Sequence, residues 1–316
     1  MNMAKAIVLF ILGLALVIFF AEKLVKATVG TSRGFGISTF LISVIFIGFD
    51  PENLAVGAVG SYEEIAGIAL GSIIGAAMVA IALAFGTTAL IIPMKFESAP
   101  KAILAIPAGA VSLLGVLSID GTLSRIDGVM LLIAYVLSVL FLIWLAKKGF
   151  DIRPGGEISE TLAKVSSPGK WKALGLLIAS LAGIIAGSEI LVSASETIIA
   201  RIGLSDTVFG MTILAFLISI EELARELPAA LKGRTEISFG NVVGSILAFF
   251  LFNAGIIALI HPVVVEKQIL VFYLPLTLLT IVVLSFFMIL RKVTRLAGAL
   301  LVMLYAVFFA GAFVIK

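Results

Sequence analysis

The stretch GIALGSIIGAAMVAIALAFG, residues 67–86, contains no charged side chain. A helix needs about 20 mostly apolar residues to cross the hydrocarbon core of a bilayer. The whole chain has the same character, because 61% of its 316 residues are hydrophobic and only 13% are charged, against about 25% charged in soluble domains. Backbone in lipid must satisfy its own hydrogen bonds, and runs of this length are too long for barrel strands. The sequence therefore predicts an all-α membrane protein.

Ten runs of this kind are present, at 5–28, 36–61, 65–93, 102–118, 126–147, 171–195, 206–231, 236–260, 268–290 and 294–315. The polar segment 148–170 divides them into five and five. We expect a first five-helix repeat over 1–147, a linker over 148–170 and a second five-helix repeat over 171–316. Loops on the side of the linker hold sixteen Lys and Arg residues and the opposite loops hold five. This bias predicts a multi-pass protein of the cell membrane with a cytoplasmic linker and both termini outside.

The two halves resemble each other. Residues 67–86 align with EISFGNVVGSILAFFLFNAG, residues 236–255, with three glycines of each segment in register. Upstream, FIGFDPENLA (46–55) aligns with FLISIEELAR (216–225) and pairs Glu52 with Glu222. Because each half has an odd number of spans, the second half enters the membrane from the opposite side. The sequence thus predicts an inverted-topology repeat, which in secondary transporters places the substrate near the bilayer midplane.

Glycines in the third span predict close helix packing. Gly67, Gly71 and Gly75 recur every four residues, so one face of this helix is nearly flat. Small faces let two helices approach closely in lipid. Packing is the simpler role of these glycines.

Four acids fall near the middle of two spans that the repeat relates. Asp50 and Glu52 are in the second span, and Glu221 and Glu222 are in the seventh. A charge at the bilayer centre costs about 2.5–3.5 kcal/mol even on the lenient insertion scale. Cations or protons are the simplest way to satisfy these carboxylates. Pro51 lacks an N–H and interrupts a helix, which frees carbonyl oxygens that, with carboxylates, suit a hard cation.

An ion pair is the alternative for one of these acids. Arg225 follows Glu221 by four residues, the spacing of an intrahelical pair, and Glu221 then faces away from the site. The second span has no Lys or Arg near Asp50 and Glu52. We therefore predict Glu52 and Glu222 as a facing pair of metal ligands, with Asp50 and Glu221 as further candidates.

Composition excludes several other chemistries. The chain has no cysteine and one histidine, which rules out thiolate and multi-histidine metal sites. A net charge of +3 does not form a nucleic-acid-binding stripe. An intramembrane aspartyl protease would also use two buried acids, but the Gly-x-Gly-Asp signature is absent. We expect a transporter rather than an enzyme or a channel, with no cofactor, with the lipid bilayer and inorganic cations as partners, and with a sequence that is compatible with a monomer.

These motifs resemble those of the calcium:cation antiporter superfamily, which includes sodium/calcium and cation/proton exchangers. That family has ten helices in a five-plus-five inverted repeat, and motifs of the form G-T-S-x-P-E and G-N-x-x-G-S-N. The chain has IGFDPE at 47–52 and LISIEE at 217–222, then GSIIGAA at 71–77 and GNVVGSI at 240–246. The resemblance implies that Glu52 and Glu222 bind calcium, with Ser219 and Ser245 as hydroxyl ligands.

The chain departs from the family where sodium sites are built. The threonine and serine of the first motif are replaced by Gly48 and Phe49, and later polar positions by Ala76, Ala80 and Phe249. Two buried carboxylates near each other favour protonation, and two protons neutralise the same site as one calcium ion. We therefore expect a calcium (divalent cation)/proton antiporter in which Glu52 and Glu222 are both ligands and proton carriers. A sodium/calcium exchanger is the alternative.

Overall fold

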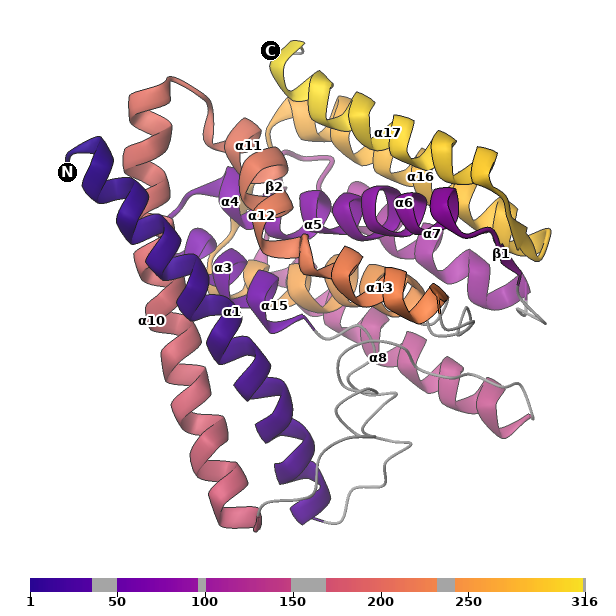
Figure 1. Cartoon of the computed structure of the whole chain (residues 1–316), viewed down its shortest axis with the longest axis horizontal. Helices are drawn as coiled ribbons and strands as arrows, with labels where there is room; N and C mark the ends of the chain where they lie inside the picture. Colours follow the sequence, from indigo (N-terminus) through magenta and orange to yellow (C-terminus); the bar gives the residue numbers. More distant parts are fainter. Residues whose placement is uncertain (36–49, 96–100, 149–168, 232–241, 315–316) are drawn as a thin grey trace.

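The computed structural model describes residues 1–35, 50–95, 101–148, 169–231 and 242–314, which form a predominantly helical protein (Figure 1). In this part of the chain, eight helices are long and apolar enough to cross a membrane. The fourth predicted span has a shorter apolar helix, 105–117. Of the second predicted span, 36–49 lies outside the described residues and 51–61 is helical. The predicted class is confirmed, and the observed helices follow the predicted order.

The first half contains α1 (Met3–Gly34), α3 (Pro51–Tyr62), a continuous third span, α7 (Lys101–Leu117) and α8 (Arg125–Lys147). The third span runs through α4 (Ala66–Leu70), η1 (Gly71–Gly75), α5 (Ala76–Met78), η2 (Val79–Ala84) and α6 (Phe85–Ile91). Its η segments are π-helical turns, which are frequent at functional sites.

The second half begins with α10 (Lys170–Ile202) and a seventh span made of α11 (Asp206–Val208), η3 (Phe209–Leu214), α12 (Ala215–Ser219) and α13 (Glu221–Leu231). The eighth span is helical from 242 and continues through η4 (Ala248–Asn253) and α15 (Ala254–Ile260). The chain then forms η5 (Ile269–Tyr273), α16 (Leu274–Ile289) and α17 (Arg295–Val314).

Two short antiparallel ladders connect the halves. β1 (Met94–Lys95) pairs with β4 (Lys292–Val293), and β2 (Thr122–Leu123) pairs with β3 (Val263–Val264). Corresponding elements recur 169 residues later, as Val79 to Ala248 at the start of η2 and η4 and Met94 to Val263 at the start of β1 and β3. Each ladder thus joins a loop of the first half to a loop of the second.

α1 and α10 form a long tilted pair at one side of the molecule (Figure 1). Their backbones approach closely, since a Cβ on Gly13 would lie 2.7 Å from the Leu191 nitrogen. Both helices are longer than the predicted spans of 5–28 and 171–195. α10 continues until Gly203, whose φ of 72° provides a left-handed cap, a conformation that costs glycine little.

The third span is the most deeply buried of the eight candidate spans. It crosses the seventh span at glycines: a Cβ on Gly71 would lie 2.3 Å from the Gly210 carbonyl carbon, and one on Gly67 would lie 2.2 Å from the Asp206 carbonyl carbon. The Gly67 N–H also donates to Asp206 Oδ2 at 2.9 Å. The predicted close packing is confirmed, and its partner is the backbone of the other half.

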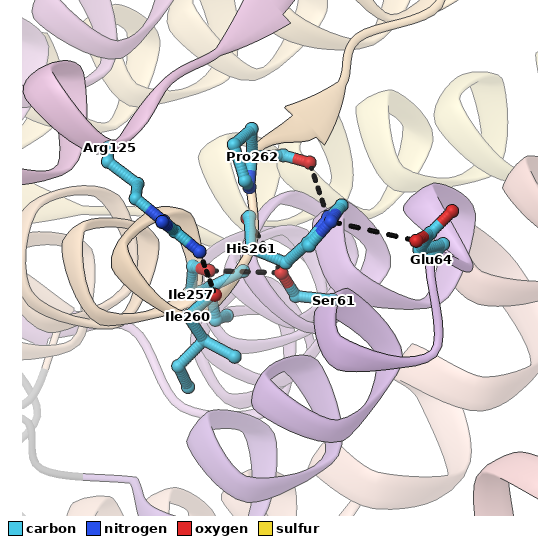
Figure 2. Close-up of polar contacts among 7 residues, drawn as sticks. All are labelled: Ser61, Glu64, Arg125, Ile257, Ile260, His261 and Pro262. Atoms are coloured by element: carbon cyan, nitrogen blue, oxygen red, sulfur yellow. Dashed lines mark hydrogen bonds and ion pairs between the residues drawn. The ribbon is translucent and has the colours of Figure 1, made fainter.

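Polar contacts hold the far end of α3 against the end of α15 (Figure 2). Ser61 Oγ lies 3.0 Å from the Ile257 carbonyl oxygen and 2.9 Å from that of His261. His261 Nε2 lies 3.6 Å from Glu64 Oε1. These contacts fix the helix whose first turn carries Glu52.

Candidate cation-binding site

Asp50 and Pro51 start the helix that carries Glu52. Asp50 is extended (φ −129°, ψ 91°), and its Oδ1 accepts the backbone N–H of Asn53 at 2.8 Å. An aspartate N-cap followed by proline at the first helical position is a favoured helix start, because the cap satisfies a free N–H and proline has none to lose. α3 therefore begins at Pro51, and residues 36–49, which precede this start, lie outside the described residues.

The seventh span has a mild break at Ile220. α12 ends at Ser219 and α13 begins at Glu221, with only Ile220 between them (φ −61°, ψ −25°). No proline is present here, so the backbone stays near helical values. Glu221 and Glu222 occupy the first turn of α13, as Glu52 does in α3. Acids favour this position because of the partial positive charge at a helix N-terminus.

The two carboxylates predicted as the central pair are both buried. The exposed fraction is 2% for Glu52 and 3% for Glu222. Ser219 and Ser245 are buried as well, while Glu221 is only partly buried. These positions remain predicted ligands.

Asn53, which the sequence reasoning missed, joins α3 to the seventh span. Its Nδ2 donates to Asp50 Oδ2 at 2.9 Å and to Ser219 Oγ at 3.0 Å. Asp50, Asn53 and Ser219 therefore form one hydrogen-bonded chain from the first half to the second. Both Asp50 oxygens accept hydrogen bonds from Asn53, so a capping role accounts for this buried acid without a metal ion. The sequence signal that could have identified Asn53 was an amide side chain directly after Glu52, in the first turn of a predicted helix.

A further buried acid lies one turn after Glu222. Glu226 is 2% exposed, although it was not among the predicted site residues. Val56 stands four residues after Glu52 in the first half and is fully buried. The second-half helix α13 thus carries a buried acid at a position where α3 has an apolar side chain.

Apolar side chains occupy positions where the resemblance expects sodium ligands. Ala76, Ala80 and Phe249 are all buried in the core. Within the described ranges, no group of three or more His, Asp or Glu side chains is placed to hold a metal ion. A bound calcium ion, which takes six to eight oxygens, would need carbonyl, hydroxyl, amide or water oxygens beside the glutamates.

Known proteins resemble the chain along most of its length. The family model of the sodium/calcium exchanger protein matches residues 5–144 and 172–314. The uncharacterized membrane protein MJ0091 of Methanocaldococcus jannaschii is 33% identical over 76% of this chain and 76% of its own. The putative antiporter CaxA of Alkalimonas amylolytica is 30% identical over 84% of this chain and 83% of its own.

A solved structure shows the same architecture. The sodium-calcium exchanger NCX_Mj, soaked with 2.5 mM Na+ and 10 mM Sr2+, matches with a TM-score of 0.61 and 27% identity, over 98% of this chain and 99% of that chain. Members of this family are antiporters, not catalytic enzymes. The chain belongs to the sodium/calcium exchanger family, within the calcium:cation antiporter superfamily.

Proposed function

We propose that the chain exchanges calcium for protons across the membrane by alternating access. One observation carries the proposal: Glu52 and Glu222 are almost fully buried, and each lies in the first turn of its helix, α3 or α13, within a predicted membrane span. The hydrogen bond from Asn53 to Ser219 brings these two segments together. Buried acids in membrane spans mark ion and proton pathways.

The charge of the pair accounts for the exchange. Two carboxylates carry two negative charges, which one divalent cation or two protons neutralise equally. A closed site costs least in the low-dielectric interior when it is neutral, so the carrier changes conformation with either load. Glu52 and Glu222 then serve in turn as ligands and as proton carriers.

Apolar replacements favour protons over sodium as the counter-ion. Ala76, Ala80 and Phe249 offer no side-chain oxygen, and all three are buried. Sodium is a hard cation that needs such oxygens, whereas a proton needs only the carboxylate itself. The first-motif positions Gly48 and Phe49 lie outside the described residues.

The observed pairing of loops supports the proposed topology of two inverted five-helix repeats, over 1–147 and 171–316, joined by a linker over 148–170. The family model matches in two stretches separated near this linker. Each ladder joins two loops that the Lys and Arg bias assigns to one side: β1 with β4 on the cytoplasmic side, and β2 with β3 outside. We place both termini outside.

Uptake of radioactive calcium into everted membrane vesicles tests the counter-ion. We expect a proton gradient, acid inside, to drive uptake, and a sodium gradient of equal size to drive none. Dissipating the proton gradient with an ionophore should abolish uptake. Vesicles without the protein provide the background.

Sodium/calcium exchange is the second candidate, since the family model and NCX_Mj carry that name. The same vesicles decide between the two. Sodium-driven uptake as large as proton-driven uptake would overturn the proton assignment and leave calcium transport in place.

A further inference from the structure

We propose that Asn53 is a neutral ligand of the transported cation, with Oδ1 as the coordinating atom. The inference rests on the proposed function and adds a ligand to its site. Asn53 is 1% exposed and follows Glu52 directly in the first turn of α3. It is also the residue that links this turn to Ser219 of the seventh span.

The hydrogen bonds of Asn53 fix the direction of its carboxamide. Nδ2 has two N–H groups, and these meet a carboxylate oxygen of Asp50 at 2.9 Å and the hydroxyl of Ser219 at 3.0 Å. A flipped amide would place Oδ1 against the carboxylate, which accepts hydrogen bonds and does not donate them. The amide nitrogen therefore faces Asp50, and Oδ1 faces away from it.

Oδ1 is buried and has no hydrogen-bond partner among the described residues. A buried acceptor without a partner costs about 1–3 kcal/mol, and such groups in folded proteins call for an explanation. A bound cation supplies one, because an amide carbonyl oxygen is a normal calcium ligand. Asn53 is almost fully buried, so bulk water does not serve as the hydrogen-bond partner of Oδ1.

The position of Oδ1 suits an ion shared with Ser219. Two oxygens bound to one calcium ion at about 2.4 Å lie no more than about 5 Å apart. Oδ1 lies near this range, because it belongs to the same carboxamide as the Nδ2 that is 3.0 Å from Ser219 Oγ. Ser219 accepts this bond with one lone pair and keeps another for a cation.

Calcium titration calorimetry on the purified full chain at pH 8 tests the role of Asn53. Asn53→Leu removes both the oxygen and the donors. Asn53→Asp keeps oxygens at the same place but cannot donate to Asp50 or Ser219 when it is ionised. Asn253→Leu is the matched control, since Asn253 is a fully buried asparagine in η4 whose carboxamide has no hydrogen-bond partner among the described residues.

We expect Asn53→Leu to raise the calcium Kd at least about tenfold, and Asn53→Asp and Asn253→Leu to keep it within about threefold of the wild-type value. Equal weakening in Asn53→Leu and Asn53→Asp would assign Asn53 to holding Asp50 and Ser219 and overturn the ligand role. Wild-type affinity in Asn53→Leu would overturn it too. If Asn53→Leu does not fold, Asn53→Asp decides alone, because the two roles predict opposite results for it.

The same titration separates this inference from the proposed function. Glu52→Gln is measured in parallel. If the wild type binds calcium and Glu52→Gln does not, the glutamate site stands whatever Asn53 does. If the wild type binds no calcium at pH 8, the proposed function fails and the role of Asn53 fails with it.

Discussion

Asn53 Nδ2 and Ser219 Oγ lie 3.0 Å apart although 166 residues separate them in the chain. The bond connects the first turn of α3 to the last residue of α12. Asn53 directly follows Glu52, and Ser219 lies three residues before Glu222. Both glutamates are buried. The two halves of the chain therefore meet where the candidate ligands lie.

Asp50 should contribute mainly to stability. Asp50→Ala removes the N-cap of α3 and the acceptor of Asn53 Nδ2, and we expect a loss of about 2–3 kcal/mol in unfolding free energy. Asp50→Asn keeps a capping oxygen and should lose less than half as much. Unfolding in mixed detergent micelles, followed by circular dichroism, measures both. Equal losses in the two variants would contradict the capping role.

The buried glutamates should be indispensable, and an exposed one should not. Glu52→Gln and Glu222→Gln each leave the site with a single negative charge, so we expect proton-driven calcium uptake to fall to the level of empty vesicles. Glu189→Gln is the matched control, since Glu189 lies on the exposed face of α10. Its uptake should stay within about twofold of the wild type. Substantial uptake by either buried variant would remove that residue from the mechanism.

Patterns within one helix could be predicted from the sequence, and contacts between distant segments could not. Apolar runs determined the helices, and the glycine repeat predicted the close approach of Gly71, because both depend on spacing along one chain segment. The partner of that glycine face, Gly210, lies in the other half and leaves no local signal. The extra length of α1 and α10 was missed because hydropathy measures the membrane core and not the helix end.

In the candidate site, too, local features could be predicted from the sequence and contacts between distant segments could not. Burial of Glu52 and Glu222 was predicted from their place in apolar spans. Asp50 was interpreted as a ligand candidate, yet an aspartate before proline is also a readable N-cap signal. Asn53 was missed because its role depends on Ser219. Glu226 was missed because a single acid near the end of a span is typical of an exposed helix face.

Close packing at Gly71 should be essential. In Gly71→Ala the new Cβ would lie 2.3 Å from a backbone carbon of Gly210, and neither backbone can yield without separating the third and seventh spans. We expect loss of folded, monodisperse protein on size exclusion. Gly109→Ala is the control, because no atom of the described residues lies within 4 Å of its added Cβ, and alanine favours a helix by up to about 1 kcal/mol. Normal folding of Gly71→Ala would contradict the described crossing.

Ser61 should stabilise the far end of α3. Ser61→Ala removes the donor to the carbonyl oxygens of Ile257 and His261, which should cost about 1 kcal/mol. Ser138→Ala is the matched control, since that hydroxyl donates within its own helix, α8, to the Ala134 carbonyl oxygen. Thermal unfolding in detergent compares the two. A melting temperature unchanged by Ser61→Ala and lowered by Ser138→Ala would contradict this anchor.

Calcium binding should release protons. If protons and calcium compete for Glu52 and Glu222, then lowering the pH fills the site with protons and must weaken calcium binding, while raising it must strengthen binding. Each calcium ion should displace up to about two protons under conditions where both acids are protonated. Calorimetry in two buffers of different ionisation enthalpy counts the protons, because the buffer takes up each one. If Glu222→Ala still binds calcium, each bound ion should release fewer protons, because one of the two acids is gone. Calcium binding that is independent of pH and sensitive to sodium would identify sodium as the competing ion instead.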